Sequence, residues 1–372
     1  DAGALAIVAG GDEALDADGV AELAWRLLEL LVALGAQIHG DFQTYVLLGP
    51  AARYAPLRGL LRSCRKEHPE LRLRSLTLVS GGARLPATPM EAQLDAGELL
   101  VRRLVPLRAL TLTPPPEDLD YVVPAAPAAG TAIVTGGLRG LGVRVARWLL
   151  DEGRALRVVL VGRNLPAAGS AAARDVDELV GRGTAEVRRC DVSEAEQVAL
   201  LPEAQLVVHC AGAIDDQLMR DVTAPRAAAV LSAKVAGTLH LRQRYGGGAR
   251  LVCFSSSSAE LGVVGQATYG AANAFVDELC GGDAIQWGGW AEAGMAADHN
   301  IQPLAGERFL PVARGLAALG ALLDAAPRRT APTLVLDVDW SAYQSNTTII
   351  SEAERLLGRA DKPAAAARRA EG

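Results

Sequence analysis

The segment that most constrains the fold runs over residues 131–150. It begins with β-type residues at 132–134, passes through a glycine-rich turn and continues as an amphipathic helix. Glycine suits such a turn, because only a residue without Cβ adopts its backbone angles and lets a diphosphate come close to the main chain. The free N–H groups at the start of the helix would face that anion. A glycine-rich connection between any strand and helix would show the same pattern, so this segment alone does not establish that the turn binds a diphosphate.

Strand-like and helix-like patterns alternate from this segment to about residue 340. We expect further strands at 157–162, 185–192, 205–212, 249–256, 284–287 and 333–338. Helices are expected around 171–181, 193–201, 226–245, 266–280 and 310–323. The alternation predicts an α/β fold with a doubly wound parallel sheet, in which ligands bind beyond the carboxyl ends of the strands.

Residues 1–125 are predicted to form a second, Rossmann-like unit with a mainly parallel sheet. Strands are expected at 4–10, 44–49, 72–80 and 99–107, with helices at 16–34 and 56–67. After the first strand, Asp12 and Glu13 place acid where a phosphate would need an anion site, so we interpret this unit as a degenerate, structural one. Residues 113–130 read as a stiff Pro- and Ala-rich connector, 126–344 as the second unit and 345–372 as a linker or tail.

The composition excludes several classes of protein. At 372 residues, half of them apolar, the chain can form two moderate cores. The net charge is −6 with scattered basic residues, and the longest apolar stretch, 27–34, is interrupted by Glu29, so we expect neither nucleic acid nor membrane as a partner. Five cysteines without a CxxC pair indicate reduced thiols in a cytoplasmic protein, and five dispersed histidines disfavour a metal site. His209 reads as a core residue, and the start at Asp1 suggests a piece of a longer chain.

Four polar residues follow in a specific order: Lys234, Ser256, Tyr269 and Asn273. Tyr269 and Asn273 are four positions apart, so they share one face of the predicted helix. Ser256 ends the strand that leads to this helix. Each is ordinary by itself, as a surface lysine or a packing side chain, and only their joint order and spacing indicate a site.

Together with these residues, several stretches resemble the short-chain dehydrogenase/reductase superfamily, specifically the ketoreductase domains of modular polyketide synthases. They are TGGLRGLG, CDV, HCAGA, AKVAGTLHL, LVCFSSSSAELGVVGQATYGAANAFVDEL and WGGWAEAGMA. The resemblance covers about residues 131–340, and residues 1–125 resemble the degenerate structural subdomain of such ketoreductases.

The resemblance implies a role for each polar residue. Tyr269 would be the general acid, made acidic by the Lys234 ammonium, which would also hold the nicotinamide ribose. Ser256, which the family's thirteen-residue spacing to the tyrosine selects from a run of four serines, would bind the carbonyl oxygen. Asn273 would order a water or lysine relay to the tyrosine.

The expected cofactor is NADPH. The second strand of the larger unit ends at Arg163 where an NAD-binding fold usually carries an acid, and Arg139 adds a second cation for a 2′-phosphate. Asp191 and Val192 would flank the adenine, and Ala211 and Gly212 the inner ribose. The full set of expected cofactor contacts is Thr135, Gly136, Gly137, Leu138, Arg139, Gly140, Leu141, Gly142, Arg163, Asp191, Val192, Ala211, Gly212, Lys234 and Tyr269.

Other motifs bear on the substrate side. The run Ile214, Asp215, Asp216 resembles the Leu-Asp-Asp signature of B-type ketoreductases, and Leu261 stands where A-type domains carry tryptophan. Val264 and Thr268 depart from the B-type pattern. Trp290 and Met295 belong to a segment that resembles the one leading into the substrate lid of the family. The connection at 281–283 is shorter than in relatives.

We therefore predict an NADPH-dependent ketoreductase that reduces the β-keto group of a carrier-bound ketoacyl thioester with B-type stereochemistry. Its partners would be an acyl or peptidyl carrier protein bearing a phosphopantetheine thioester and the neighbouring domains of a megasynthase for antibiotic biosynthesis. Two alternatives stay open: an α-ketoacyl thioester reductase of a nonribosomal peptide synthetase, and a non-catalytic scaffold module.

Overall fold

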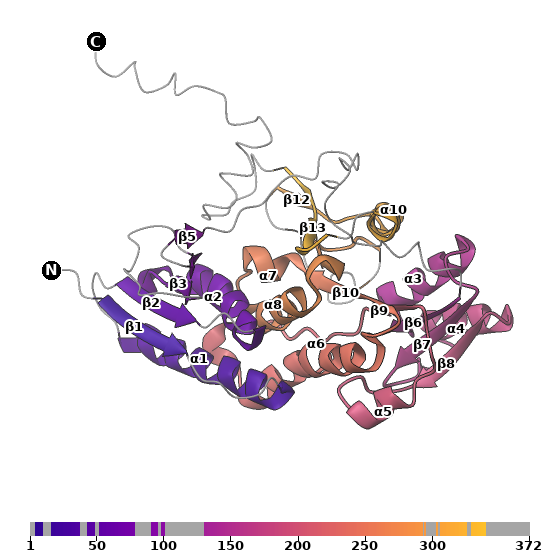
Figure 1. Ribbon diagram of the computed structural model, residues 1–372, viewed down its shortest axis with the longest axis horizontal. Coiled ribbons are helices and arrows are strands. Elements are labelled where there is room, and N and C mark those ends of the chain that lie inside the picture. The colour runs from indigo at the N-terminus through magenta and orange to yellow at the C-terminus, as the bar shows by residue number, and fades with distance from the viewer. Residues whose placement is uncertain are drawn as a thin grey trace, which may run out of the picture.

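The computed structural model describes residues 4–9, 16–37, 43–48, 52–78, 91–95, 98–100, 130–292, 294, 303, 306–325 and 329–339. Its larger sheet has seven parallel strands in the order β13-β11-β10-β9-β6-β7-β8 (Figure 1). Their bounds are β6 Thr131–Thr135, β7 Arg157–Gly162, β8 Ala185–Arg189, β9 Leu206–His209, β10 Arg250–Ser256, β11 Ala284–Trp287 and β13 Thr333–Val335. The order reverses between β6 and β9, which is the switch point of a doubly wound sheet. The predicted fold class is confirmed.

Helices cover both faces of this sheet. One face carries α3 (Gly140–Asp151), α4 (Ala171–Gly181) and α10 (Val312–Asp324), and the other carries α5 (Ala195–Ala199), α6 (Ala224–Tyr245) and α8 (Ala267–Cys280). Successive side chains of a strand point to opposite faces of the sheet. Ala132 and Val134 therefore pack in the core on the side of α3, α4 and α10, and Ile133 packs in the core on the side of α5 and α6. Burial on both faces explains why these strands are apolar almost without interruption.

The N-terminal sheet contains β1 (Ala4–Ala9), β2 (Gln43–Leu48), β3 (Arg74–Leu78), β4 (Glu91–Asp95) and β5 (Glu98–Leu100) in sequence order. The first four are parallel and β5 is antiparallel to β4. Among these described strands the order never reverses, so they form no switch-point crevice. This topology fits the structural role expected from the acidic turn at Asp12.

The strand predicted at 99–107 is only partly seen. The described part is the three-residue β5, and residues 101–107 lie outside the described residues. The prediction missed β4, whose sequence EAQLD has no β-branched or aromatic residue and therefore little strand propensity.

The two units share a hydrophobic core. Helix α2 (Ala55–Glu67) packs on α8, and α1 (Ala17–Gln37) packs on α6 (Figure 1). Leu57 and Leu61 of α2 belong to the same buried cluster as Phe275 of α8. The helices approach so closely that a Cβ on Gly59 would lie 2.3 Å from the carbonyl oxygen of Gly270. The N-terminal unit is therefore packed directly against the helix that carries Tyr269.

Several predicted elements end earlier or divide. The strands expected at 185–192 and 205–212 stop at Arg189 and His209, so that Asp191 and Ala211 lie in loops. The segment 333–338 divides into β13 and β14 (Asp337–Val338), which pairs with β12 (Glu307–Arg308).

The remaining elements are short connections. Helix α7 (Ser257–Leu261) was not predicted, and the 3-10 turns are η1 (Ala52–Tyr54), η2 (Pro69–Leu71), η3 (Met219–Asp221) and η4 (Gly281–Asp283). The single turn η4 joins α8 to β11, in keeping with the short connection noted in the sequence. Within the described ranges, no helix is long and apolar enough to cross a membrane.

Candidate active site

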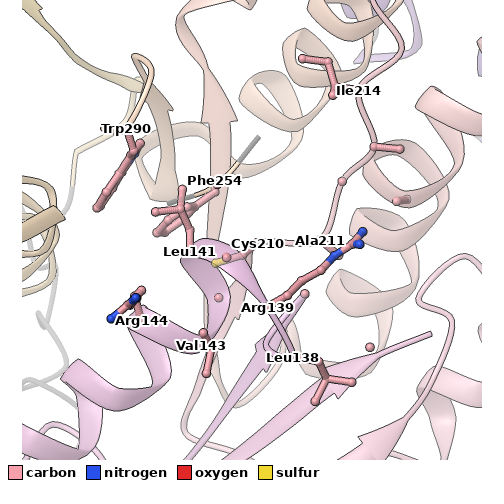
Figure 2. A pocket seen from close by; sticks show the side chains of 18 of the residues that line it. Leu138, Arg139, Leu141, Val143, Arg144, Cys210, Ala211, Ile214, Phe254 and Trp290 are labelled. Carbon is pink, nitrogen blue, oxygen red and sulfur yellow. The ribbon is translucent and has the colours of Figure 1, made fainter. Parts of the chain in front are cut away.

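A cleft of about 1090 Å³ opens at the carboxyl ends of the central strands, at the switch point between β6 and β9. Figure 2 shows the glycine-rich loop and α3 among its walls, together with Phe254 of β10 and with Trp290, which follows β11. A doubly wound sheet places its ligand at this edge.

The glycine-rich loop is held close to its neighbours. Gly136 has a φ of +67°, and a Cβ there would lie 3.0 Å from the main chain of Ala211. A Cβ on Gly142 would meet the carbonyl oxygen of Gly136 at 2.1 Å. Both positions therefore require glycine, which explains the spacing of the motif.

The loop ends at the N-terminus of α3, and the first residues of this helix line the cleft. Among the described residues, the N-cap residue Arg139 provides no side-chain hydrogen bond to the first N–H groups of α3. They and the positive end of the helix are the donors that a diphosphate needs. The residues present thus fit the diphosphate of a nicotinamide dinucleotide.

Three arginines border this part of the cleft: Arg139, Arg144 and Arg163. The Arg163 side chain is 52% exposed, and its Nη1 lies 3.7 Å from Oδ2 of Asp191, which also lines the cleft. The sequence analysis missed Arg144 (Figure 2), although it follows Gly140 by four positions and therefore lies on the same face of α3. Its helical spacing was the signal that could have identified it.

A buried hydrogen-bonded chain supports the floor of the cleft. The Thr135 hydroxyl and Nδ1 of His209 are 2.7 Å apart, and Nε2 of His209 lies 3.2 Å from the carbonyl oxygen of Ala233. Because a carbonyl only accepts, Nε2 carries the proton and Nδ1 accepts from Thr135, whose oxygen in turn accepts from the Ala211 N–H. Burial, with a smaller effect of the Lys234 charge, lowers the pKa of His209 to about 3. His209 is a satisfied core residue, as predicted.

Lys234 is buried, with 2% of its surface exposed. Its Nζ donates a hydrogen bond to the carbonyl oxygen of Phe254, the β10 residue two positions before Ser256. Burial lowers the pKa of this ammonium below its ordinary value. Lys234 also lines the cleft, next to Ala233.

Tyr269 and Ser256 line the same cleft. Ser256 caps α7: its Oγ accepts from the N–H of Ser258 at 3.2 Å and from the Ser258 hydroxyl at 3.0 Å. Burial raises the pKa of Tyr269 to about 12, while hydrogen bonding to Asn273 and Ser256 opposes the rise and the Asp216 charge adds to it. In this structure burial dominates the pKa of Tyr269 and the ammonium of Lys234 is bound to Phe254, so the acidification of this phenol by Lys234 stays a prediction.

Asn273 lies beneath Tyr269 on α8 and is fully buried. Its Nδ2 donates to the carbonyl oxygen of Tyr269 at 2.9 Å. Its Oδ1 is buried and, as far as the described residues extend, accepts no hydrogen bond.

Two segments border the cleft, one at 214–219 through Ile214 and one at 262–266 through Val263 and Gln266, and we call these two segments the mouth of the cleft. Asp215 pairs with Arg226 of α6, whose Nε lies 2.5 Å from Oδ2 and holds the pKa of Asp215 below its ordinary value. Gln266 donates from Nε2 to Oδ2 of Asp216 at 3.0 Å. The Gln217 N–H donates to the carbonyl oxygen of Gly265 at 2.8 Å, so side-chain and main-chain bonds join the two segments.

The structure brings most of the predicted site residues into this one cleft. Those that line it are Gly136, Leu138, Arg139, Gly140, Leu141, Gly142, Arg163, Asp191, Val192, Ala211, Gly212, Ile214, Lys234, Ser256, Tyr269 and Trp290. Those that stand behind or beside the lining are Thr135, Gly137, Asp215, Asp216, Leu261 and Asn273. Met295 lies outside the described residues.

Phe254 is a further lining residue that the sequence analysis did not single out. Its ring centroid lies 5.3 Å from that of Trp287 and 6.4 Å from that of Trp290, and the two indoles are 4.9 Å apart. This cluster forms an apolar part of the lining of the cleft. Over the described ranges, no group of three His, Cys, Asp or Glu side chains could hold a metal ion.

Comparison with known proteins agrees with this geometry. The family model of the KR domain matches residues 130–290. The chain is 33% identical to the polyketide synthase GfsA of Streptomyces halstedii over 388 aligned residues, which cover 98% of this chain but 5% of that protein. The chain thus spans a small part of the curated relatives it matches.

Solved structures show the same architecture. A structure of an A1-type ketoreductase is 25% identical with a TM-score of 0.74, over 93% of this chain and 81% of that one. The first ketoreductase of the tylosin PKS is 26% identical with a TM-score of 0.70, over 90% and 77% of the two chains. The resemblance inferred from the sequence motifs is confirmed. Residues 130–290 of this chain therefore belong to the KR domain family, and the chain has the short-chain dehydrogenase/reductase fold of polyketide synthase ketoreductases.

Proposed function

We propose that this chain reduces the β-keto group of a carrier-bound ketoacyl thioester with NADPH. One observation carries the proposal: the hydroxyl-bearing residues Ser256 and Tyr269 line the same cleft as the glycine-rich loop and Arg163. A cofactor lying over that loop and a carbonyl next to those hydroxyls would meet in a single cavity.

Bound NADPH would supply the hydride. The N–H groups at the start of α3 would hold its diphosphate, and Arg163 would bind its 2′-phosphate, with Arg139 and Arg144 as further cations in the lining of the cleft. Asp191 and Val192 would flank the adenine, Ala211 and Gly212 the inner ribose, and Lys234 the nicotinamide ribose.

The side chains supply the proton and the orientation. Tyr269 donates its phenolic proton to the carbonyl oxygen, and Ser256 hydrogen-bonds the same oxygen as negative charge develops there. Burial raises the pKa of Tyr269 to about 12, so the phenol holds its proton near neutral pH and the proton is present for transfer to the developing alkoxide. We assign reprotonation of Tyr269 to a water at the unpartnered Oδ1 of Asn273, since that buried oxygen can accept a hydrogen bond.

We further propose the B-type alcohol configuration. Ile214 lines the cleft, and Asp215 and Asp216 are held beside it by Arg226 and Gln266. Leu261 is buried behind the mouth, where A-type relatives carry tryptophan. The proposed partners are a carrier protein and the neighbouring domains of a megasynthase. We assign residues 1–125 to the structural subdomain and 126–344 to the catalytic one, and five free thiols support a cytoplasmic location.

The test is NADPH oxidation by the purified chain with a small 3-ketoacyl thioester. We expect turnover, and a loss of about 100-fold or more in Tyr269→Phe. Tyr245→Phe is the matched control, because it removes a tyrosine hydroxyl that donates to the carbonyl oxygen of Pro202 and does not line the cleft. Preferred turnover of a 2-ketoacyl thioester would instead indicate the α-keto reductase. Absence of NADPH binding by the folded protein would indicate a scaffold module.

A further inference from the structure

The last two turns of α2, in the N-terminal unit, hold the backbone at the mouth of the cleft. Ser63 Oγ accepts from the N–H of Val263 at 3.2 Å, and Lys66 Nζ donates to the carbonyl oxygen of Gly262 at 2.8 Å. One turn before Lys66, Arg62 donates to the carbonyl oxygen of Ala259. A loop that leads to α8 thus has its polar main-chain groups satisfied by a helix about 200 positions away in sequence.

Glu67, the last residue of α2, differs from these neighbours because it contacts both segments of the mouth. Its Oε1 accepts from the N–H of Gly265 at 2.9 Å, and its Oε2 accepts from the N–H of Met219 at 2.7 Å. Gly265 belongs to the segment 262–266, and Met219 ends the segment 214–219. One carboxylate therefore bridges the two sides of the entrance.

The position of this carboxylate is unfavourable for the helix itself. Acidic side chains at a helix C-terminus face the negative end of the helix dipole, and α2 otherwise ends with the basic residues Arg65 and Lys66. A carboxylate also offers two acceptors and no donor, which is what two main-chain N–H groups require. Glutamine keeps the length but replaces one acceptor by a donor, which would point at an N–H group.

Each bridged residue lies close to a group that acts on the substrate in the proposed function. Gly265 is four positions before Tyr269, and Met219 is three positions after Asp216. The bridge therefore joins the segment that precedes the general acid to the segment that we assign to stereocontrol.

We propose that Glu67 is a positioning residue for substrate binding, through which the N-terminal unit controls the width of the substrate entrance and the face of the carbonyl that meets the cofactor. This inference rests on the proposed ketoreductase function. Glu67 acts through Gly265 and Met219 and does not line the nucleotide cleft.

The first test compares Glu67→Gln and Glu67→Ala with the control Glu70→Gln. Glu70 is an exposed acid three positions further on, and its Oε1 lies 2.7 Å from Nδ1 of His68. For both Glu67 variants we expect the KM for a 3-ketoacyl thioester to rise about ten-fold, with kcat changed less. A larger share of the opposite alcohol should form, and the Kd for NADPH should stay within about two-fold, because the glycine-rich loop is not involved. Unchanged KM and product configuration in folded variants would overturn the inference.

A second measurement needs no variant. Hydrogen–deuterium exchange in the wild-type chain should show the amides of Gly265 and Met219 protected, and fast exchange of both would refute the bridge even if the variants do not fold. The two proposals can be separated. A wild-type chain that binds NADPH but reduces no ketoacyl thioester disproves the function. An active wild type whose Glu67 variants have an unchanged KM and product configuration disproves only the positioning role.

Discussion

The guanidinium of Arg163 and the carboxylate of Asp191 lie 3.7 Å apart at the edge of the cleft, one after β7 and the other after β8. The pair is loose and more than half of the Arg163 side chain is exposed, so this arginine keeps donors available for an incoming phosphate.

Replacing Arg163 by alanine should therefore raise the KM for NADPH about ten-fold or more, because a charge-assisted contact to the 2′-phosphate is lost. The KM for NADH should change little. Steady-state kinetics with both cofactors checks this. The control is Arg188→Ala, which removes an exposed arginine of β8 that is paired with Glu186 outside the cleft. An unchanged KM for NADPH in Arg163→Ala would refute the cofactor assignment.

The raised pKa of Tyr269 predicts how kcat/KM depends on pH in alkaline solution. Because burial raises this pKa to about 12, the phenol keeps its proton at all pH values below that range. We expect kcat/KM to show no loss from phenol ionisation between about pH 7 and about pH 10. A pH–rate profile checks this. A falling limb centred near neutrality and absent from Tyr269→Phe would show that a cation lowers the pKa of the phenol after all.

The lowered pKa of His209 predicts that the free energy of unfolding decreases in acid. Its pKa is about 3 in the folded chain, below the ordinary value of 6.5, so the unfolded state binds a proton that the folded state does not. The stability from this residue is complete above about pH 6.5 and falls by roughly 1.4 kcal/mol per pH unit as the pH decreases toward 3.

Urea unfolding at several pH values measures this slope. His209→Gln should be less stable near neutral pH, by about 2 kcal/mol, because buried hydrogen bonds to Thr135 and Ala233 are lost. Its stability should also depend less on pH than that of the wild type. Equal slopes for the two proteins would contradict the buried, neutral histidine.

Gly59 tests the packing of α2 on α8. A Cβ there would meet the Gly270 carbonyl oxygen at 2.3 Å and the Ala274 Cβ at 2.8 Å, so Gly59→Val must push the two helices apart. We expect a loss of about 3 kcal/mol and, since Tyr269 is on α8, lower activity in the protein that remains folded.

The matched control is Gly247→Ala, at a position where a Cβ would have no neighbour within 4 Å. Thermal unfolding and turnover measure both effects. If Gly59→Val were as stable and as active as Gly247→Ala, the close approach of the helices would be wrong.

The sequence determined the features that depend on local geometry. The glycine spacing from Gly136 to Gly142 indicated the loop, because backbone angles and close approach are properties of neighbouring residues. The strand and helix periods indicated the doubly wound sheet, and the four-residue spacing of Tyr269 and Asn273 placed them on one helix face. Arg163 followed from its position at the end of a strand.

Only the tertiary structure decided the contacts between segments far apart in the chain. It directs Lys234 at Phe254 and places the Glu67 carboxylate between Gly265 and Met219. Nothing in the local pattern of α2 distinguishes Glu67 from an ordinary exposed acid. Its role arises because the shared apolar core packs α2 on α8, and that packing is a property of the whole folded chain.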